Sequence, residues 1–150
     1  MSELSDLYQE VILDHNRSPR NYRKCDECNH DAEGFNPLCG DHIFVYINLE
    51  NERIKDISFQ GSGCAISKSS ASLMTSILKG KTRQEAEDLF NKFHEVVTSK
   101  IGSEQDLSEL GKLAVFAGVR DYPARVKCAS LAWHTMLNAL KDDGNKISTE

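Results

Sequence analysis

The chain has 150 residues, a length that predicts one domain over residues 1–150 with a modest hydrophobic core. Hydrophobic residues make up 39% and charged residues 27%, as in an ordinary globular protein, and no long apolar run predicts a helix that crosses a membrane. The formal net charge of −5 argues against non-specific binding to nucleic acid or to a membrane surface.

The first half of the chain predicts one helix and one β-hairpin. Its N-terminus has neither the basic start nor the apolar stretch of a signal peptide, so we expect a cytoplasmic protein. Residues 4–15 follow a helical pattern. Residues 24–31 are polar and residues 34–41 are rich in turn formers, whereas residues 42–49 and 54–59 have the composition of the two strands of a hairpin.

The second half predicts helices. Residues 65–78 have a helical pattern, and one side of that helix is made of small residues, which would either admit another backbone or a cofactor or face solvent. Residues 80–97 predict another helix, with a capping box formed by Thr82 and Glu85. Residues 106–118 predict a short helix and a turn. Pro123 opens a last helix, and the tail at about 142–150 is expected to fray. The expected class is α+β, a small antiparallel sheet covered by helices.

The cysteines point to a metal or to thiol chemistry. Their number is odd and the expected compartment is reducing, so a disulfide framework is not expected. The alternative is that each cysteine is a small buried hydrophobic residue. The five cysteines are Cys25, Cys28, Cys39, Cys64 and Cys128.

Three of the cysteines lie at the ends of predicted elements, where a rigid scaffold can bring distant residues together. Cys39 lies in a turn before a strand, Cys64 lies in a glycine-rich turn before a helix, and Cys128 lies near the start of the last helix. A helix N-terminus favours thiolate at Cys64. Asp41 adds a carboxylate two residues after Cys39. These four residues form a plausible tetrahedral Cys3Asp site for Zn²⁺, although three thiolates would also suit iron in a cluster.

The carboxylate makes this set unlike a purely structural zinc site, which usually has Cys and His ligands. Three thiolates and one carboxylate around Zn²⁺ give a formal charge of −2, which weakens the hold on any single ligand. Arg125 and Lys127 flank Cys128 and would moderate this charge, or would be the solvated start of a helix. The alternative for Asp41 is an ordinary turn residue that caps its own backbone.

The same residues carry a resemblance to a known family. The sequences NPLCGD at 36–41, GSGCAIS at 61–67 and PARVKC at 123–128 resemble, in this order, the three cysteine motifs of the IscU/NifU-N family of iron–sulfur cluster assembly proteins. Residues 7–21 resemble the first helix of that family, and the likeness extends over about residues 4–140. It implies a small antiparallel three-stranded sheet packed against several helices.

Two features resemble the SufU branch of this family. Lys127 precedes the last cysteine, where classical IscU scaffolds have a histidine, and residues 80–100 resemble an inserted helical segment of SufU-type proteins. The resemblance implies a sulfurtransferase that takes persulfide from a SufS-type cysteine desulfurase and acts with downstream Suf assembly proteins. It implies zinc on Cys39, Asp41, Cys64 and Cys128.

Within that resemblance, Cys39 is the expected sulfur acceptor. Our hypothesis is that Cys39 leaves zinc and becomes the persulfide, while another side chain fills its place. His42 and a histidine of the desulfurase are both candidates for that replacement.

Other functions remain open from the sequence. A scaffold that builds and transfers a labile [2Fe–2S] cluster would use the same ligands and would not be an enzyme. A zinc-stabilised interaction module would hold an inert metal. Cys25 and Cys28 form a C-x-x-C that departs from the family pattern and could be a metal half-site, a redox pair or an exposed accident.

Overall fold

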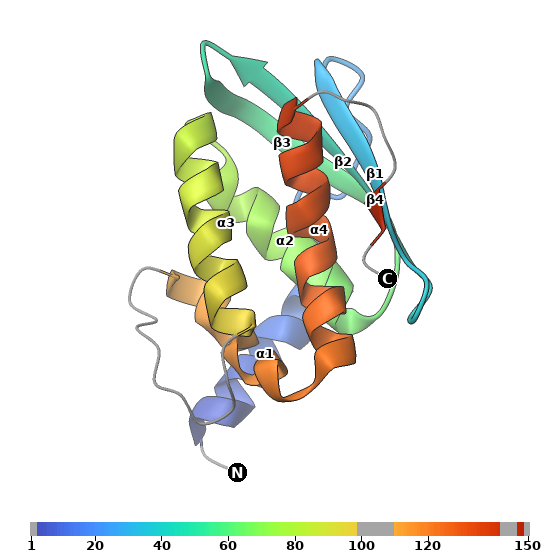
Figure 1. Cartoon of the computed structure of the whole chain (residues 1–150), viewed down its shortest axis with the longest axis vertical. Coiled ribbons are helices and arrows are strands. Elements are labelled where there is room, and N and C mark those ends of the chain that lie inside the picture. Colours follow the sequence, from blue (N-terminus) through green and yellow to red (C-terminus); the bar gives the residue numbers. More distant parts are fainter. Residues whose placement is uncertain (1–2, 99–109, 142–146, 149–150) are drawn as a thin grey trace.

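The computed structural model describes residues 3–98, 110–141 and 147–148 (Figure 1). Three antiparallel strands form most of one sheet: β1 (His30–Asn36), β2 (Asp41–Glu50) and β3 (Arg53–Ser62). The two-residue strand β4 (Ile147–Ser148) runs parallel to β1, which gives the strand order β3-β2-β1-β4. The α+β class and the three antiparallel strands confirm the expected fold.

Helices cover one face of this sheet (Figure 1). The helix α2 (Ala65–Leu78) packs on β3, and α4 (Pro123–Lys141) packs on β1 and β2. The helix α1 (Glu3–Arg17) packs on α2, while α3 (Arg83–Val97) and the 3₁₀ helix η1 (Gly111–Asp121) pack on α4. Pro123 is the first residue of α4, as predicted.

The residue pattern of β1 did not predict a strand. Its inward positions are Ala32, Gly34 and Asn36, so the segment has no alternation of large apolar residues. A Cβ atom on Gly34 would lie 2.0 Å from Thr135 Oγ1, which shows how closely α4 approaches this strand. The close approach of α4 therefore requires the small residues that hid β1 in the sequence.

The small residues of α2 serve close packing of helices. Ser70 Oγ donates to the carbonyl oxygen of Ala129 at 2.6 Å and accepts from Trp133 Nε1 at 3.2 Å. Ser72 Oγ accepts from the backbone N–H of Arg20 at 2.8 Å. These hydroxyls are fully buried, so this side of α2 faces neighbouring segments of the chain rather than solvent.

The capping box predicted for the helix of residues 80–97 is present at the start of α3. Thr82 Oγ1 accepts from the backbone N–H of Glu85 at 3.1 Å, and Glu85 Oε1 accepts from the backbone N–H of Thr82 at 3.0 Å. That this segment is an insertion remains a prediction. For the predicted helix over 106–118, the part before residue 110 lies outside the described residues, and the rest belongs to η1.

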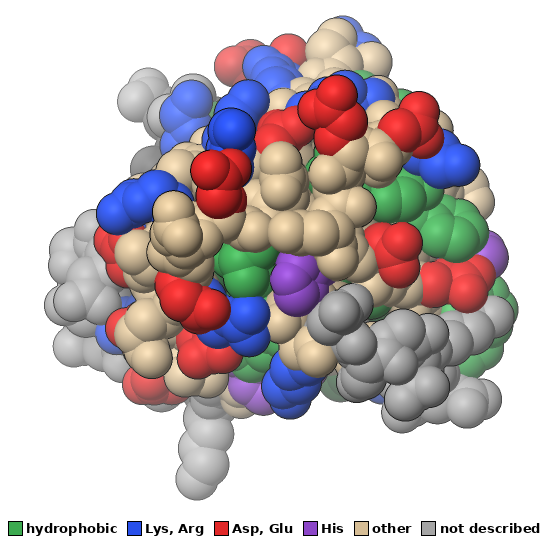
Figure 2. Space-filling model, turned by 90° about the horizontal axis from the view of Figure 1, so that it is seen from above, with side chains coloured by type: hydrophobic (Ala, Val, Ile, Leu, Met, Phe, Trp, Pro, Cys, Tyr) green, Lys and Arg blue, Asp and Glu red, His purple; other side chains and the backbone are tan. Residues whose placement is uncertain are grey.

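The tail differs from expectation at one point. Ile147 and Ser148 pair with β1, where the sequence predicted a frayed end, and the remainder of 142–150 lies outside the described residues. Across the described part of the chain, the helices are too short or too polar to span a bilayer. Acidic and basic side chains are interspersed over the face of the molecule seen in Figure 2.

Cys25 and Cys28 form a disulfide with a Cα–Cα distance of 5.5 Å, although no disulfide framework was expected. The C-x-x-C spacing places both sulfurs in one short turn, which makes a local bond geometrically accessible. The turn is tied to the sheet by Asn29, whose side chain bonds the backbone of Leu49. Leu49 lies eight residues along β2 from Asp41, so this turn is roughly 25 Å from the start of that strand.

We predict that the double substitution Cys25→Ser/Cys28→Ser leaves the fold intact and lowers the free energy of unfolding only slightly. A four-residue loop closes with little entropy, so the loss of unfolding free energy is expected to be about 2 kcal/mol or less. Urea unfolding of the two proteins under oxidising conditions measures this loss. A loss above about 4 kcal/mol would contradict the prediction, because the disulfide would then stabilise more of the fold than its own turn.

His15 lies in the core, where α1 packs on α2. It is 5% exposed, and its Nδ1 lies 2.7 Å from Ser72 Oγ. Burial lowers the pKa of His15 from its ordinary 6.5, and the nearby cations Arg20 and Lys112 add to this. The neutral ring is therefore the form that the folded chain favours.

The free energy of unfolding is predicted to fall as the pH drops below 6.5. The pKa of His15 is lower in the folded chain, so the unfolded chain binds the proton first, and stability is complete above the unfolded pKa. His134, whose pKa burial also lowers, acts in the same direction. Between pH 7.5 and 5.5, wild type should lose on the order of 1 kcal/mol more than His15→Gln in urea unfolding. Equal losses in the two proteins would contradict this assignment.

Candidate metal centre

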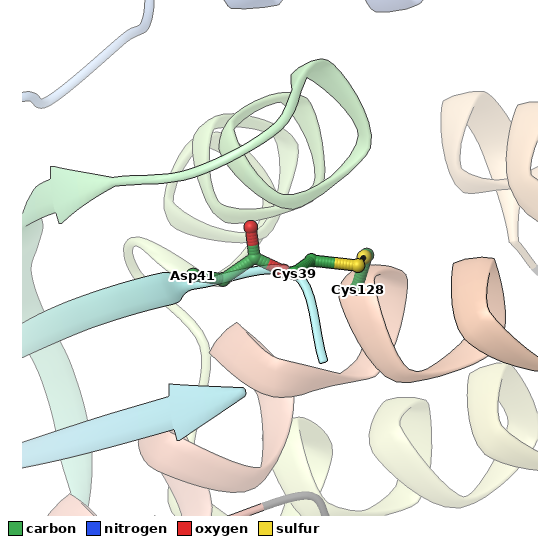
Figure 3. Close-up of side chains that lie close together, drawn as sticks. All are labelled: Cys39, Asp41 and Cys128. Atoms are coloured by element: carbon green, nitrogen blue, oxygen red, sulfur yellow. Dashed lines mark hydrogen bonds between the residues drawn. The ribbon is translucent and has the colours of Figure 1, made fainter. Parts of the chain in front are cut away.

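Three potential metal ligands meet where β1, β2 and α4 come together (Figure 3). Cys39 lies in the turn between β1 and β2, Asp41 is the first residue of β2, and Cys128 lies in α4. One ligand atom from each residue lies within 4.8 Å of the others. The two sulfurs are 3.3 Å apart, with the Cys128 thiol donating to Cys39. Sequence separations of up to 89 residues therefore close into one cluster.

The turn that carries Cys39 projects from the body of the protein. Gly40 has a φ of +73°, a conformation that glycine adopts without steric cost, and its N–H donates to the carbonyl oxygen of Asn36 at 2.9 Å. A Cβ atom added to Gly40 would have no neighbour within 4 Å. Cys39 is exposed, and the adjacent Leu38 is 64% exposed. A partner molecule can therefore approach the Cys39 thiol directly.

Asp41 is completely buried, and both of its carboxylate oxygens accept hydrogen bonds. Oδ1 accepts from the backbone N–H of Cys64 at 2.9 Å, and Oδ2 accepts from Asn36 Nδ2 at 3.1 Å. A Cβ atom on Gly63 would lie 2.6 Å from Oδ1, so this position has room only for glycine. Asp41 is therefore a structural part of the centre rather than a turn residue that caps its own backbone.

Cys64 is the N-cap of α2, as the sequence predicted. Its Sγ accepts from the backbone N–H of Ser67 at 3.5 Å, at the positive end of the helix dipole. Its backbone bonds Asp41, and its thiol interacts with that of Cys128. The Cys64 sulfur does not belong to the group of ligand atoms within 4.8 Å of one another. The structure thus gathers three of the four expected ligands and places Cys64 beside them.

The chemistry of this donor set fits a bound cation. Cys128 is 2% exposed, and burial raises the pKa of its thiol far above 9.0, with further contributions from Cys39, Asp41 and Cys64. Loss of the proton from this buried thiol, beside a buried carboxylate, would require a compensating positive charge, which a divalent metal supplies. Sulfur and carboxylate oxygen together are ligands that zinc accepts.

Asn36 is a buried member of this centre that the sequence analysis did not single out. Besides Asp41, its Nδ2 approaches Cys128 Sγ at 3.6 Å. The signal in the sequence was a polar residue just before a Pro-containing turn, which is common in proteins and is not specific.

His42 is placed differently from the role suggested for it, whereas Arg125 lies at the solvated start of α4, one of the two alternatives given for it. His42 follows Asp41 on β2, so its side chain points to the opposite face of the sheet, where it pairs with Glu33. In this backbone arrangement it is not positioned to replace Cys39. The guanidinium of Arg125 lies over the ring of Tyr122, 4.5 Å from its centroid, on the exposed start of α4.

Comparisons with known proteins agree on one family. Residues 7–129 match the family model described as the NifU-like N-terminal domain. The chain is 37% identical to the iron–sulfur cluster assembly scaffold protein IscU of Streptococcus pyogenes over 145 residues, covering 97% of this chain and 89% of that protein. It is 35% identical to the zinc-dependent sulfurtransferase SufU of Bacillus subtilis over 144 residues, covering 95% and 96%.

A solved structure shares the fold. It comes from Fervidobacterium islandicum AW-1 and is described as an iron–sulfur cluster assembly scaffold for the SUF system. It superposes with a TM-score of 0.80 at 35% identity, covering 87% of this chain and 94% of that one.

Proposed function

The chain belongs to the family of NifU-like N-terminal domains, and from this membership we propose that it serves iron–sulfur cluster assembly as a zinc-dependent sulfur acceptor. Its donor would be a cysteine desulfurase of the SufS type, and downstream Suf assembly proteins would take the sulfur onward. The relatives described as a SufU sulfurtransferase and as a SUF scaffold support this assignment. The observation that carries it is the exposed residue Cys39, whose sulfur lies beside the buried pair of Asp41 and Cys128.

Cys39, Asp41, Cys64 and Cys128 are the proposed zinc ligands. Asp41 and Cys128 are buried and Cys39 completes the cluster, while Cys64 lies next to it at the N-terminus of α2. Zinc bound there would keep the thiols deprotonated at neutral pH. The buried carboxylate and the backbone of Cys64 hold this end of β2 against the start of α2.

Cys39 is the proposed acceptor because its surroundings differ from those of the other two thiols. Cys128 is buried beside Asn36, and the Cys64 sulfur accepts a hydrogen bond from Ser67 N–H. Cys39 lies in the turn between β1 and β2 and is the exposed residue of the three. A thiol in that position can reach into a recess of a donor protein, whereas a buried thiol cannot.

The proposed transfer is a thiol–persulfide exchange. The Cys39 thiolate attacks the outer sulfur of the donor persulfide, and a new S–S bond forms at Cys39. The S–S bond of the donor breaks, and the donor cysteine leaves as a thiolate. One persulfide is consumed and one is made, so the step needs no external oxidant or reductant.

The test is alanine formation from cysteine by a SufS-type desulfurase, with and without the zinc-loaded protein. Bound zinc and iron are quantified in the same samples. We expect strong stimulation, because removal of the persulfide frees the desulfurase for another turnover. The absence of stimulation by the zinc-loaded wild type would refute the sulfur-acceptor function.

A scaffold for a labile [2Fe–2S] cluster is the second candidate, favoured by the IscU scaffold of Streptococcus pyogenes among the relatives. Iron would then be cargo on the same Cys and Asp side chains. Anaerobic reconstitution with iron and sulfide, followed by transfer to an apo-ferredoxin, separates the two functions. A cluster that transfers intact, without stimulation of the desulfurase, would favour the scaffold.

A further inference from the structure

We propose that Asn36 is the positioning residue that holds Asp41 and Cys128 together, so that Cys39, rather than Cys128, is the thiol left free to react. This inference rests on the proposed function at the same site. Asn36 ends β1 at a fully buried inward position, next to the turn that carries Cys39.

One side chain joins three parts of the centre. Asn36 Nδ2 donates to Asp41 Oδ2 at 3.1 Å on β2 and approaches Cys128 Sγ at 3.6 Å on α4. Its Oδ1 accepts from the backbone N–H of Leu38 at 3.3 Å in the turn. The backbone N–H of Leu38 also fixes the orientation of the Asn36 amide, because an N–H donor must face the amide oxygen and not the NH2 group. The NH2 group must therefore face Asp41 and Cys128.

The amide supplies donors to two of the proposed ligands. Asp41 Oδ2 and Cys128 Sγ are both acceptors within reach of the neutral NH2 group of Asn36, which holds the two side chains together without adding charge. Partners outside the ligand shell of a metal orient the ligands in this way, and their loss typically costs 10–100-fold in metal affinity. Asn36 is placed for this role on two ligands at once.

Cys39, unlike Cys128, receives no hydrogen bond from the amide of Asn36. The backbone of Asn36 closes the turn through the N–H of Gly40, but the amide of Asn36 bonds Asp41 and Cys128 and not the Cys39 sulfur. The hydrogen-bond contact of the Cys39 sulfur is with the Cys128 thiol. The ligand that the protein supports least is thus the one that is exposed.

The test compares Asn36→Ser and Asn36→Asp with Asn29→Ser as a matched control. Serine is too short to bridge the two ligands, whereas aspartate keeps the size and the acceptor for Leu38 but loses the donor. Asn29 likewise uses both ends of its amide, with Nδ2 donating to the Leu49 carbonyl at 2.8 Å and Oδ1 accepting from the Leu49 N–H at 2.9 Å. Asn29 lies beside the far end of β2, away from Asp41.

Two readouts that need no desulfurase are measured on each folded variant. Zinc affinity is measured by competition with a chromophoric chelator, and the order of cysteine alkylation in the zinc-loaded protein is read by peptide mass spectrometry. We expect wild type and Asn29→Ser to bind zinc equally and to alkylate first at Cys39. Both Asn36 variants should bind zinc about 10–100-fold more weakly and should alkylate at Cys128 together with Cys39.

The outcomes separate this inference from the proposed function. If Asn36→Asp bound zinc as tightly as wild type and kept the same order of alkylation, the role of Asn36 would be overturned. The proposed function would not be affected, because it is tested separately by stimulation of the desulfurase. An equal loss of zinc in Asn29→Ser would also overturn the role of Asn36, because the effect would then be one of general stability.

Discussion

Replacing Cys39 with alanine is expected to reduce stimulation of alanine formation by at least about 100-fold while zinc remains bound. A methyl group cannot form the S–S bond of the acceptor step. The exposed Cys39 lies outside the buried part of the centre, where Asp41 and Cys128 retain their contacts with Asn36. A zinc ion with three protein ligands can take water in its fourth position, so loss of this thiol need not empty the site.

The control for this prediction is Cys64→Ser, assayed with zinc content measured in the same sample. If Cys39 is the acceptor, a Cys64→Ser protein that retains zinc should keep most of its sulfur acceptance. Loss of acceptance in that protein, with zinc and Cys39 in place, would count against Cys39 as the sole acceptor. Persistent stimulation by zinc-loaded Cys39→Ala would exclude Cys39 as the acceptor altogether.

Gly63→Ala is expected to weaken zinc binding by about 10–100-fold although it removes no ligand. The added Cβ atom would lie 2.6 Å from Asp41 Oδ1, closer than such atoms can approach. The carboxylate must move, and with it the hydrogen bond from Cys64 N–H that joins β2 to α2. Displacement of the orienting contacts of a metal ligand typically has an effect of this size. The same crowding should lower the free energy of unfolding by about 1–3 kcal/mol.

Gly118→Ala is the matched control, since a Cβ atom there would meet no atom within 4 Å. Chelator competition and urea unfolding should show wild-type values for this variant. If Gly63→Ala retained wild-type zinc affinity, Asp41 could not be a ligand whose position matters. If Gly63→Ala lowered the free energy of unfolding and left zinc affinity unchanged, Gly63 would matter for folding alone.

The sequence by itself determined the elements whose signals are local. The helix at 65–78 and the last helix from Pro123 have the apolar spacing of helices, and Thr82 with Glu85 is a capping box within four residues. The residue types of the centre were also readable, because a thiol and a carboxylate in one turn, with two more cysteines at the ends of predicted elements, suggest a metal. Resemblance supplied the order of the three cysteine motifs and with it the family.

Only the tertiary structure decided how these residues meet. The strand β1 shows no alternation because its inward residues are small where α4 presses on it, so its pattern depends on a helix about 100 residues later. Gly63 makes room for the side chain of Asp41, which comes from another element of the fold. His42 is a neighbour of Asp41 in sequence, yet it faces the other side of the sheet and pairs with Glu33.

Asn36 shows most clearly what cannot be predicted from the sequence. Its identity is ordinary for a residue before a turn, and its importance comes from a sulfur that lies 92 residues away in the sequence and 3.6 Å away in space. Sequence patterns report the local periodicity of the backbone and the chemical types of the side chains. The fold sets which donors face which acceptors, because packing of α4 and α2 against the sheet fixes distances that no local pattern contains.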